Sequence, residues 1–296
     1  MSEMSRPEQV PRPRAGEKSD DDDEFRTPGA VTSAYERVSG PLGDFARTIE
    51  HAPQVLPGSV LTDPAWLARR VADTGRRWNH DDARVNGTLW WYSASSSLVA
   101  APLTMLATAG EAPDPRPEHL TVSLQPNGYL KAARSDRLLG SVEEFADALC
   151  RAHAEVITVL AEVSGATPRA LWAIATDSVG NRALEAGRAA LADPGSSAAA
   201  AAAGGPAADG VSASPDADRG AALGADLART VCRPPMLSPR FVDVDGPQRS
   251  RRFVRRSSCC LIYVATDGDK CVSCPRRTPE DRHEQLLQHR IINSRQ

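Results

Sequence analysis

Cysteines are the most chemically reactive residues of this 296-residue chain, and four of the six lie within one stretch of sixteen residues. They are Cys259, Cys260, Cys271 and Cys274, and their spacing is Cys-Cys-x10-Cys-x2-Cys. Two cysteines separated by two residues can direct both thiolates at one metal from a tight turn. Thiolates are soft ligands that select zinc, copper(I) or iron–sulfur clusters. The spacing therefore predicts a four-cysteine metal site.

The adjacent pair in this motif helps to separate the candidate metals. Structural zinc sites usually present two Cys-x2–4-Cys knuckles, whereas one half here is the bare pair Cys259-Cys260. Residues 261–264 are predicted to form a strand, and neighbouring side chains on a strand point to opposite faces. Adjacent cysteines then converge poorly on one small ion, and a two-iron cluster offers a broader target. From spacing alone an iron–sulfur cluster is favoured, with zinc or a vicinal disulfide as the alternatives.

The two other cysteines are expected to take no part in this site. Cys150 follows an apolar helical pattern and is predicted to be a small buried hydrophobe, and Cys232 is predicted to be a free thiol. The N-terminal residues lack the charged-then-apolar layout of a secretory signal. We therefore predict a reducing, cytoplasmic location, where clustered cysteines bind metal more often than they form disulfides.

Composition and charge exclude several classes of protein. Hydrophobic residues make up 41% and charged residues 25%, as in globular proteins rather than fibrous, disordered or multi-span membrane proteins. A formal net charge of −3 and only 5% aromatic residues argue against a nucleic-acid partner. Residues 232–296, however, carry 13 basic and 7 acidic side chains, a net charge of +6. Arg255 and Arg256 precede the cysteines and are predicted to attract an anionic ligand or an acidic donor protein. The alternative is a solvated basic strand or a nonspecific contact with a polyanion.

Helix-capping signals place a mostly helical body ahead of the cysteines. Asp63-Pro64 predicts the start of one helix, Ser141 with Glu144 the start of a second, and Thr167-Pro168 the start of a third. The charge-free run 85–110 is long enough to span a membrane, but its serines, threonines and Pro102 favour a buried, kinked core helix without stable membrane insertion. Trp90 and Trp91 lie in this run and are expected in the core.

Two further patterns complete the predicted elements. Asn127-Gly128, between the short alternating runs 120–124 and 129–130, predicts a β-hairpin. Residues 279–292 are predicted to form a terminal helix. Asp177, with Asn181 and Arg182, is predicted to form a solvent-facing stripe on the third body helix, with the lining of a ligand pocket as the alternative. The predicted fold class is α+β: a predominantly helical body with a small β-hairpin and a C-terminal four-cysteine iron–sulfur module.

Composition shifts divide the chain into four predicted regions. Residues 1–30 are a disordered tail rich in acidic residues and proline, and residues 31–190 are the helical body. Residues 191–220 are a low-complexity insertion of alanine, glycine and proline. Residues 221–296 hold a helix and the cluster-binding module.

The cysteine motif resembles the C-terminal signature of the FhuF-like ferric-siderophore reductases, which hold a [2Fe-2S] cluster through Cys-Cys-x10-Cys-x2-Cys. Residues 88–103 and 168–175 are also similar to the helical body of that family. The resemblance implies that the four cysteines are ligands to the cluster irons. It also implies an enzyme that reduces siderophore-bound Fe(III) to Fe(II) by single electrons and so releases iron in the cytoplasm. No catalytic residue is assigned.

The electrons are expected to come from outside the chain. No Gly-x-Gly-x-x-Gly run follows a predicted strand, so a bound nicotinamide or flavin domain is not supported. The expected partners are a ferric siderophore and an external donor such as a ferredoxin or a flavin- or NAD(P)H-dependent reductase. Two other functions stay open: a siderophore-handling or scaffold protein with a structural four-cysteine zinc site, and a simple iron–sulfur electron carrier.

Overall fold

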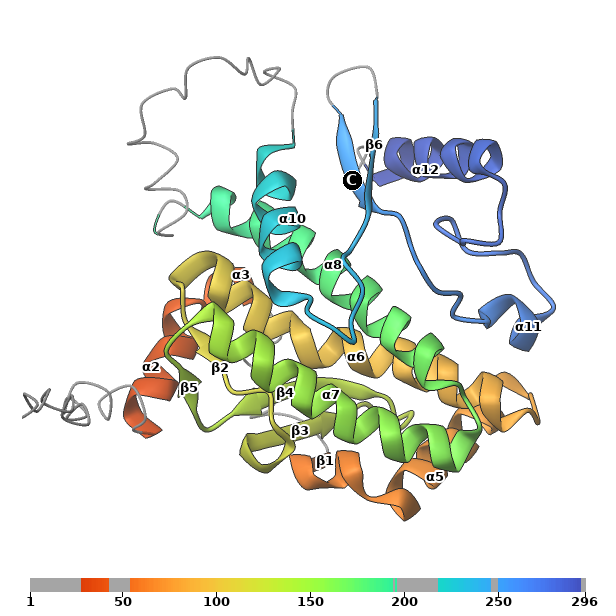
Figure 1. Ribbon diagram of the computed structural model, residues 1–296, viewed down its shortest axis with the longest axis horizontal. Coiled ribbons are helices and arrows are strands. Elements are labelled where there is room, and N and C mark those ends of the chain that lie inside the picture. Colours follow the sequence, from red (N-terminus) through yellow and green to blue (C-terminus); the bar gives the residue numbers. More distant parts are fainter. Residues whose placement is uncertain (1–27, 43–53, 194, 196–217, 246–249, 294–296) are drawn as a thin grey trace, which may run out of the picture.

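The computed structural model describes residues 28–42, 54–193, 195, 218–245 and 250–293 (Figure 1). The predicted tail therefore lies outside the described residues up to residue 27, and so does most of the predicted insertion. Helix α2 (Pro28–Arg37) begins within the last residues of that tail, and the short helix α3 (Ser39–Leu42) follows it. Two longer helices flank the insertion, because α8 runs to residue 192 and α10 begins at residue 219.

Five helices form the body: α5 (Pro64–Trp78), α6 (Ala83–Ala109), α7 (Val142–Ser164), α8 (Pro168–Ala192) and α10 (Arg219–Val231). Helix α6 packs along α8, and α8 packs along α10 (Figure 1). The helix starts predicted at residues 63, 141 and 167 are confirmed, since the side chains of Asp63, Ser141 and Thr167 accept hydrogen bonds from amides of the first turn. The structure thus has the predicted α+β class with helices dominant.

Helix α6 is the central helix of the core, as its charge-free sequence predicts. Trp90 and Trp91 are almost wholly buried, and the indole Nε1 of Trp91 donates a hydrogen bond to the carbonyl of Leu171 at 2.9 Å. The hydroxyls of Ser95 and Ser178 join α6 to α8 at 2.8 Å. Within the described part of the chain, no helix has both the length and the apolar character needed to cross a bilayer.

Glycines allow α8 and α10 to approach closely. A Cβ atom on Gly224 of α10 would lie 2.0 Å from the carbonyl oxygen of Ala183, and one on Gly187 of α8 would lie 2.1 Å from the carbonyl oxygen of Gly220. Real Cβ atoms do not approach that near, so only glycine permits this backbone contact.

Small antiparallel sheets pack against the helices of the body. Strands β1 (Gln54–Pro57), β3 (Leu120–Leu124) and β4 (Leu130–Ser135) form a three-stranded sheet in the order β1-β3-β4. The predicted hairpin joins β3 to β4, and Gly128 takes a positive φ of 84° in its turn. The 3-10 helices η1 (Gly58–Thr62) and η2 (Pro117–His119) and the short pair β2 (Ala112–Pro113) and β5 (Leu138–Leu139) complete this part.

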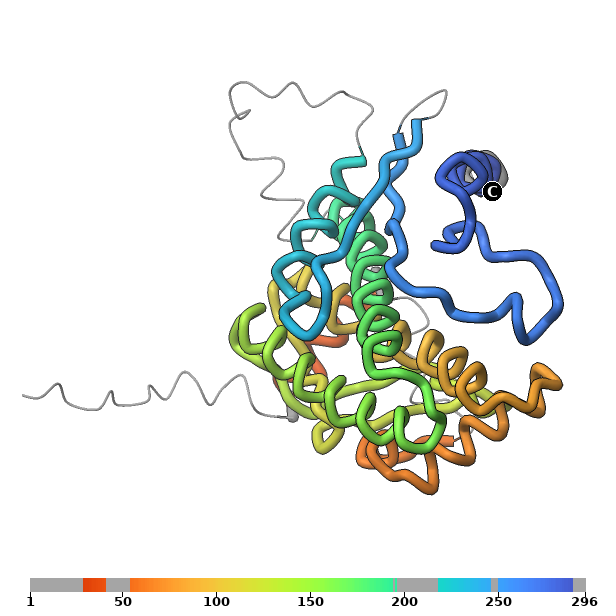
Figure 2. The backbone as a smooth tube through the Cα atoms, turned by 45° about the vertical axis from the view of Figure 1, so that its right-hand side comes forward, coloured from red at the N-terminus to blue at the C-terminus, as the bar shows by residue number. Residues whose placement is uncertain are grey.

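The C-terminal part forms a separate arm beside α8 (Figures 1 and 2). It contains the hairpin β6 (Phe241–Val244) and β7 (Arg251–Val254), the short helix α11 (Ile262–Thr266) and helix α12 (Pro279–Asn293). The predicted terminal helix is confirmed. The predicted strand at 261–264 is wrong: Leu261 takes a left-handed φ of 64°, and α11 follows it. A short apolar run fits a strand or a helix equally well, and here it packs against Val85 and Leu89 of α6.

Candidate metal centre

One buried carboxylate fixes the backbone directly ahead of the cysteines. Asp177 of α8 accepts hydrogen bonds from the amides of Ser257 and Ser258 at 2.8 and 3.0 Å, and from the Ser258 hydroxyl at 2.7 Å. Only 2% of Asp177 is exposed. Burial raises the pKa of this carboxyl, while the hydrogen bonds and the charge of Arg256 oppose the shift. Asp177 therefore ties the last residues before Cys259 to the helical body.

The four predicted cysteines come together in two pairs. The sulfurs of Cys259 and Cys274 lie 4.0 Å apart, and those of Cys260 and Cys271 both lie within 3.9 Å of Nη1 of Arg256. Each pair thus takes one cysteine from each half of the motif. The turn that presents the second half is closed by the Cys274 amide, which donates to the Cys271 carbonyl at 3.0 Å. Cys259 and Cys260 thus belong to different pairs, although they are adjacent in the chain.

This arrangement of donors fits a two-iron cluster. Two thiolates on one tetrahedral metal, with bonds of about 2.3 Å as for zinc, lie roughly 3.8 Å apart, close to the Cys259–Cys274 separation of 4.0 Å. Among the described residues, no three His, Cys, Asp or Glu side chains converge as the ligands of one ion do. A [2Fe-2S] cluster held by four cysteines takes two thiolates on each iron. Two pairs of cysteines would provide that arrangement.

A buried arginine supplies positive charge to one of the pairs. Arg256 is only 3% exposed, and its Nη1 lies 3.5 Å from Sγ of Cys271 and 3.9 Å from Sγ of Cys260. The guanidinium also stands 4.7 Å from the ring centroid of Tyr92 and forms an ion pair with Asp177, Nε to Oδ2 3.5 Å. A fixed cation at this distance stabilises negative charge on sulfur.

The ionisation of the cysteines reflects these contacts. The pKa of Cys260 is lowered to about 5, mainly by the hydrogen bond from Cys271, with Arg256 adding to the effect against burial. The same hydrogen bond raises the pKa of Cys271. Burial raises the pKa of Cys259. The Cys260–Cys271 pair therefore holds a thiolate at neutral pH, which is the form that binds metal.

Residues 256–276 match the FhuF 2Fe-2S C-terminal domain. The matched segment contains Arg256 and all four cysteines, and the match confirms the family that the motif resembles. It also indicates a [2Fe-2S] cluster, in agreement with the two sulfur pairs. No curated protein matches the chain significantly.

A cavity adjoins this FhuF-type segment at Cys259. Its volume is about 320 Å³, and it lies between the first turns of α6 and α8 and the cysteine segment. Cys259 is half-buried and forms part of the wall. A molecule in this cavity would contact a residue of the Cys259–Cys274 pair directly.

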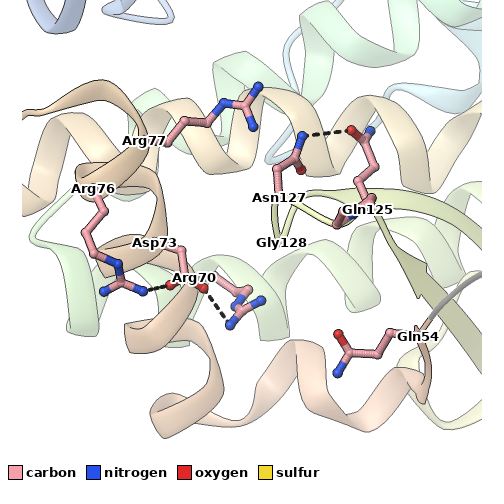
Figure 3. A pocket seen from close by; sticks show the side chains of 9 residues that line it. Gln54, Arg70, Asp73, Arg76, Arg77, Gln125, Asn127 and Gly128 are labelled. Atoms are coloured by element: carbon pink, nitrogen blue, oxygen red, sulfur yellow. Dashed lines mark hydrogen bonds and ion pairs between the residues drawn. The ribbon is translucent and has the colours of Figure 1, made fainter.

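A second cavity, of about 870 Å³, lies between the C-terminal half of α5 and the β3–β4 turn (Figure 3). Its basic side chains already have partners. Arg70 and Arg76 both form ion pairs with Asp73, and Arg77 lies over the rings of Trp78 and Tyr129. No cysteine lines it. This cavity therefore contributes nothing to the chemistry of the sulfur pairs.

Residues with the same predicted role differ in burial and in contacts in the structure. Arg255 is exposed whereas Arg256 is buried, so only Arg255 presents its charge at the surface. Cys150 is half-buried, and its thiol donates to the Arg233 carbonyl at 3.6 Å rather than joining the four. Cys232 is buried and free, and burial raises its pKa to about 12.

Sequence reasoning missed the position of Asp177. The prediction of a solvent-facing stripe is wrong for this residue, because the segment before the cysteines covers that face of α8. The available signal was an aspartate inside the run Ile174–Gly180 of small and apolar residues, all of which are buried. A carboxylate in such a run needs hydrogen-bond donors, which here come from eighty residues further along the chain.

Proposed function

We propose that this chain is an iron–sulfur ferric-siderophore reductase, which transfers single electrons to siderophore-bound Fe(III) in the cytoplasm and so releases Fe(II). The observation that carries the proposal is the meeting of four thiols in two pairs within a segment that matches the FhuF 2Fe-2S C-terminal domain. In this proposal Cys259 and Cys274 bind one iron, and Cys260 and Cys271 bind the other.

The chemistry of the substrate explains why a one-electron carrier is required. Fe(III) in a siderophore is held by hard oxygen ligands, and one added electron gives Fe(II), which those ligands hold far more weakly. A two-iron cluster with only cysteine ligands supplies a single electron at a low potential, roughly −400 mV in plant-type ferredoxins. Each Fe(III) reduced consumes one electron, which an external ferredoxin or a flavin- or NAD(P)H-dependent reductase supplies.

The protein's own residues have distinct parts in this function. Asp177 and the serine amides hold the loop so that both cysteine pairs keep their positions. Arg256 offsets the negative charge of the Cys260 and Cys271 thiolates. The cavity beside Cys259 supports a substrate site within contact distance of the other pair. The helical body provides the fixed wall against which the cysteine segment lies.

Metal analysis and single-turnover reduction test the proposal together. Anaerobically purified protein should contain about two irons and two sulfides per chain and show visible absorption that bleaches on reduction. The reduced protein, mixed with a ferric siderophore and a ferrous-specific chelator, should yield one Fe(II) for each electron it holds. Cys271→Ser should lose both the colour and the Fe(II) yield, whereas Cys150→Ser should keep both.

Other results of these experiments would support one of the alternative functions instead. Colourless protein with one zinc per chain would replace the proposal with a structural zinc site. An intact cluster that exchanges electrons with a ferredoxin but leaves the chelate oxidised would make the chain a simple electron carrier. Loss of the cluster in Cys150→Ser would contradict the ligand assignment.

A further inference from the structure

The cavity beside Cys259 is built from three separate segments that all contribute positive charge. Arg84 comes from the first turn of α6, Arg169 from the first turn of α8, and Arg276 from the loop that follows Cys274. No aspartate or glutamate lines the cavity. The polar groups that complete its wall include the hydroxyl residues Thr88 and Thr167.

Two of these guanidiniums have no acidic partner within the described ranges. Neither Arg169 nor Arg276 forms an ion pair there, and the only ring contact of Arg276 is a distant one, 6.0 Å from the centroid of Tyr263. Arg84 Nη2 lies 3.4 Å from Oδ2 of the exposed Asp82, and the same carboxylate accepts the capping hydrogen bonds from the first turn of α6. All three arginines are exposed at the mouth of the cavity, and no carboxylate of the cavity wall offsets their charge.

We propose that this cavity binds the anionic face of a negatively charged ferric chelate, such as one with catecholate or carboxylate groups, in preference to an uncharged hydroxamate chelate. The inference rests on the proposed function, because it names the substrate class of that site. Guanidinium groups bind carboxylate and phenolate oxygens through charge-assisted hydrogen bonds. With Cys259 in the wall, the bound chelate lies against the Cys259–Cys274 pair.

The shape of the site favours a small molecule over an acidic donor protein. A volume of about 320 Å³ lies within the range of small-molecule cavities, roughly 300 to 1,000 Å³. That volume accommodates one arm of a chelate, with the rest of the chelate at the opening. A docking surface for an electron-donor protein is expected to be flatter and to present its charges on a rim.

Gallium(III) chelates test the binding without any electron transfer, because gallium(III) forms the same complexes as Fe(III) but is not reduced. The holoprotein is titrated by calorimetry with trianionic gallium tris-catecholate and with uncharged gallium tris-acetohydroxamate, which share one coordination geometry. We expect the trianion to bind at least about tenfold more tightly at low ionic strength, with the difference shrinking as salt is added. The double variant Arg169→Gln/Arg276→Gln should lose that preference and leave the weak binding of the uncharged chelate unchanged.

A matched control removes the same charge elsewhere. Arg69→Gln/Arg219→Gln deletes two exposed guanidiniums that do not line this cavity, and it should keep the full preference for the trianion. Equal binding of the two chelates to the unmodified protein, or equal loss in both double variants, overturns the inference. So does unchanged chelate binding in Arg169→Gln/Arg276→Gln combined with slower electron entry from an acidic donor protein. If the trianion binds as expected but its Fe(III) analogue is not reduced, the proposed function fails and the binding site stands.

Discussion

The helical body and the cysteine segment, residues 256–276, are held in place by different forces. The body depends on apolar burial and close backbone contact, as in the α8–α10 pair with its glycines at the interface. The cysteine segment has little apolar core of its own and depends on hydrogen bonds to Asp177, the ion pair of Arg256 and the packing of α11 on α6. From this difference we expect that scaffold stability and site geometry can be changed separately in this protein.

The largest effect should come from filling the space between α8 and α10. In Gly224→Ala the new Cβ would lie 2.0 Å from the Ala183 carbonyl oxygen, so the helices must separate. We expect the free energy of unfolding to fall by about 3 to 5 kcal/mol, measured by urea denaturation. Molecules that remain folded should keep the visible spectrum of the cluster.

The matched control for this change is Gly29→Ala in α2. A Cβ there meets nothing within 4 Å, and alanine favours a helix over glycine by up to about 1 kcal/mol. Stability should therefore stay the same or rise slightly. Equal destabilisation by the two substitutions would show that close packing does not hold the body together.

A smaller loss of folding stability is expected at acidic pH, and it comes from a residue of the helical body. His153 of α7 is fully buried between Trp91 and Trp172, and neither ring nitrogen has a hydrogen-bond partner within the described structure. Burial lowers its pKa from 6.5 to about 4. Between these two pH values the unfolded chain binds a proton that the folded chain does not, so stability falls as pH decreases from 6.5 to 4. The loss from this group should total about 3 kcal/mol, from 1.36 kcal/mol per pKa unit.

Replacing this histidine isolates its contribution. In His153→Leu the unfolding free energy should depend less on pH, and the variant should gain about 3 kcal/mol over the parent between pH 6.5 and pH 4. Parallel curves for His153→Leu and the parent would show that this imidazole does not titrate as described.

The smallest effect should be confined to the cysteine segment. Arg256→Met removes the cation 3.5 and 3.9 Å from two of the four sulfurs. Since reduction adds negative charge, the reduction potential should fall, on the order of 100 mV for a charge at this range and an effective dielectric constant of about 20. Spectroelectrochemical titration measures the shift, and the visible spectrum reports whether the cluster is retained.

Two further variants distinguish charge from packing at this position. Arg256→Lys keeps the cation and should recover most of the potential. Arg255→Met removes an exposed cation and should change the potential much less, because solvent screens it. Equal shifts for Arg255→Met and Arg256→Met would remove the special role of the buried arginine.

Local rules were enough to predict most of the scaffold. Helix starts depend on capping residues such as Asp63 and Ser141, and the β3–β4 turn depends on Gly128, so the relevant information lies within a few residues. The approach of the four cysteines to one another was also predictable from spacing, although their pairing was not. The left-handed backbone at Leu261, directly after Cys260, was not predictable either, because no glycine or asparagine signals it in the sequence.

Contacts between distant residues could not be predicted in this way. The burial of Asp177 depends on which face of α8 meets a segment eighty residues later. The burial of Arg256 next to an exposed Arg255 depends on the same contact, since one side chain turns towards α8 and the other towards solvent. A single sequence contains no periodic signal for such pairs, because each involves one residue rather than a repeating face.

The attachment of the Ser257 and Ser258 amides to Asp177 has a thermodynamic consequence for cofactor uptake. These bonds join groups of α8 and of the cysteine segment, so the helical body itself helps to hold the backbone before Cys259. The entropy of fixing that part of the loop is then lost during folding, and cluster binding does not have to supply it. The apoprotein accordingly offers a recipient surface that is already partly assembled, which favours tight retention of the cofactor once it has been inserted.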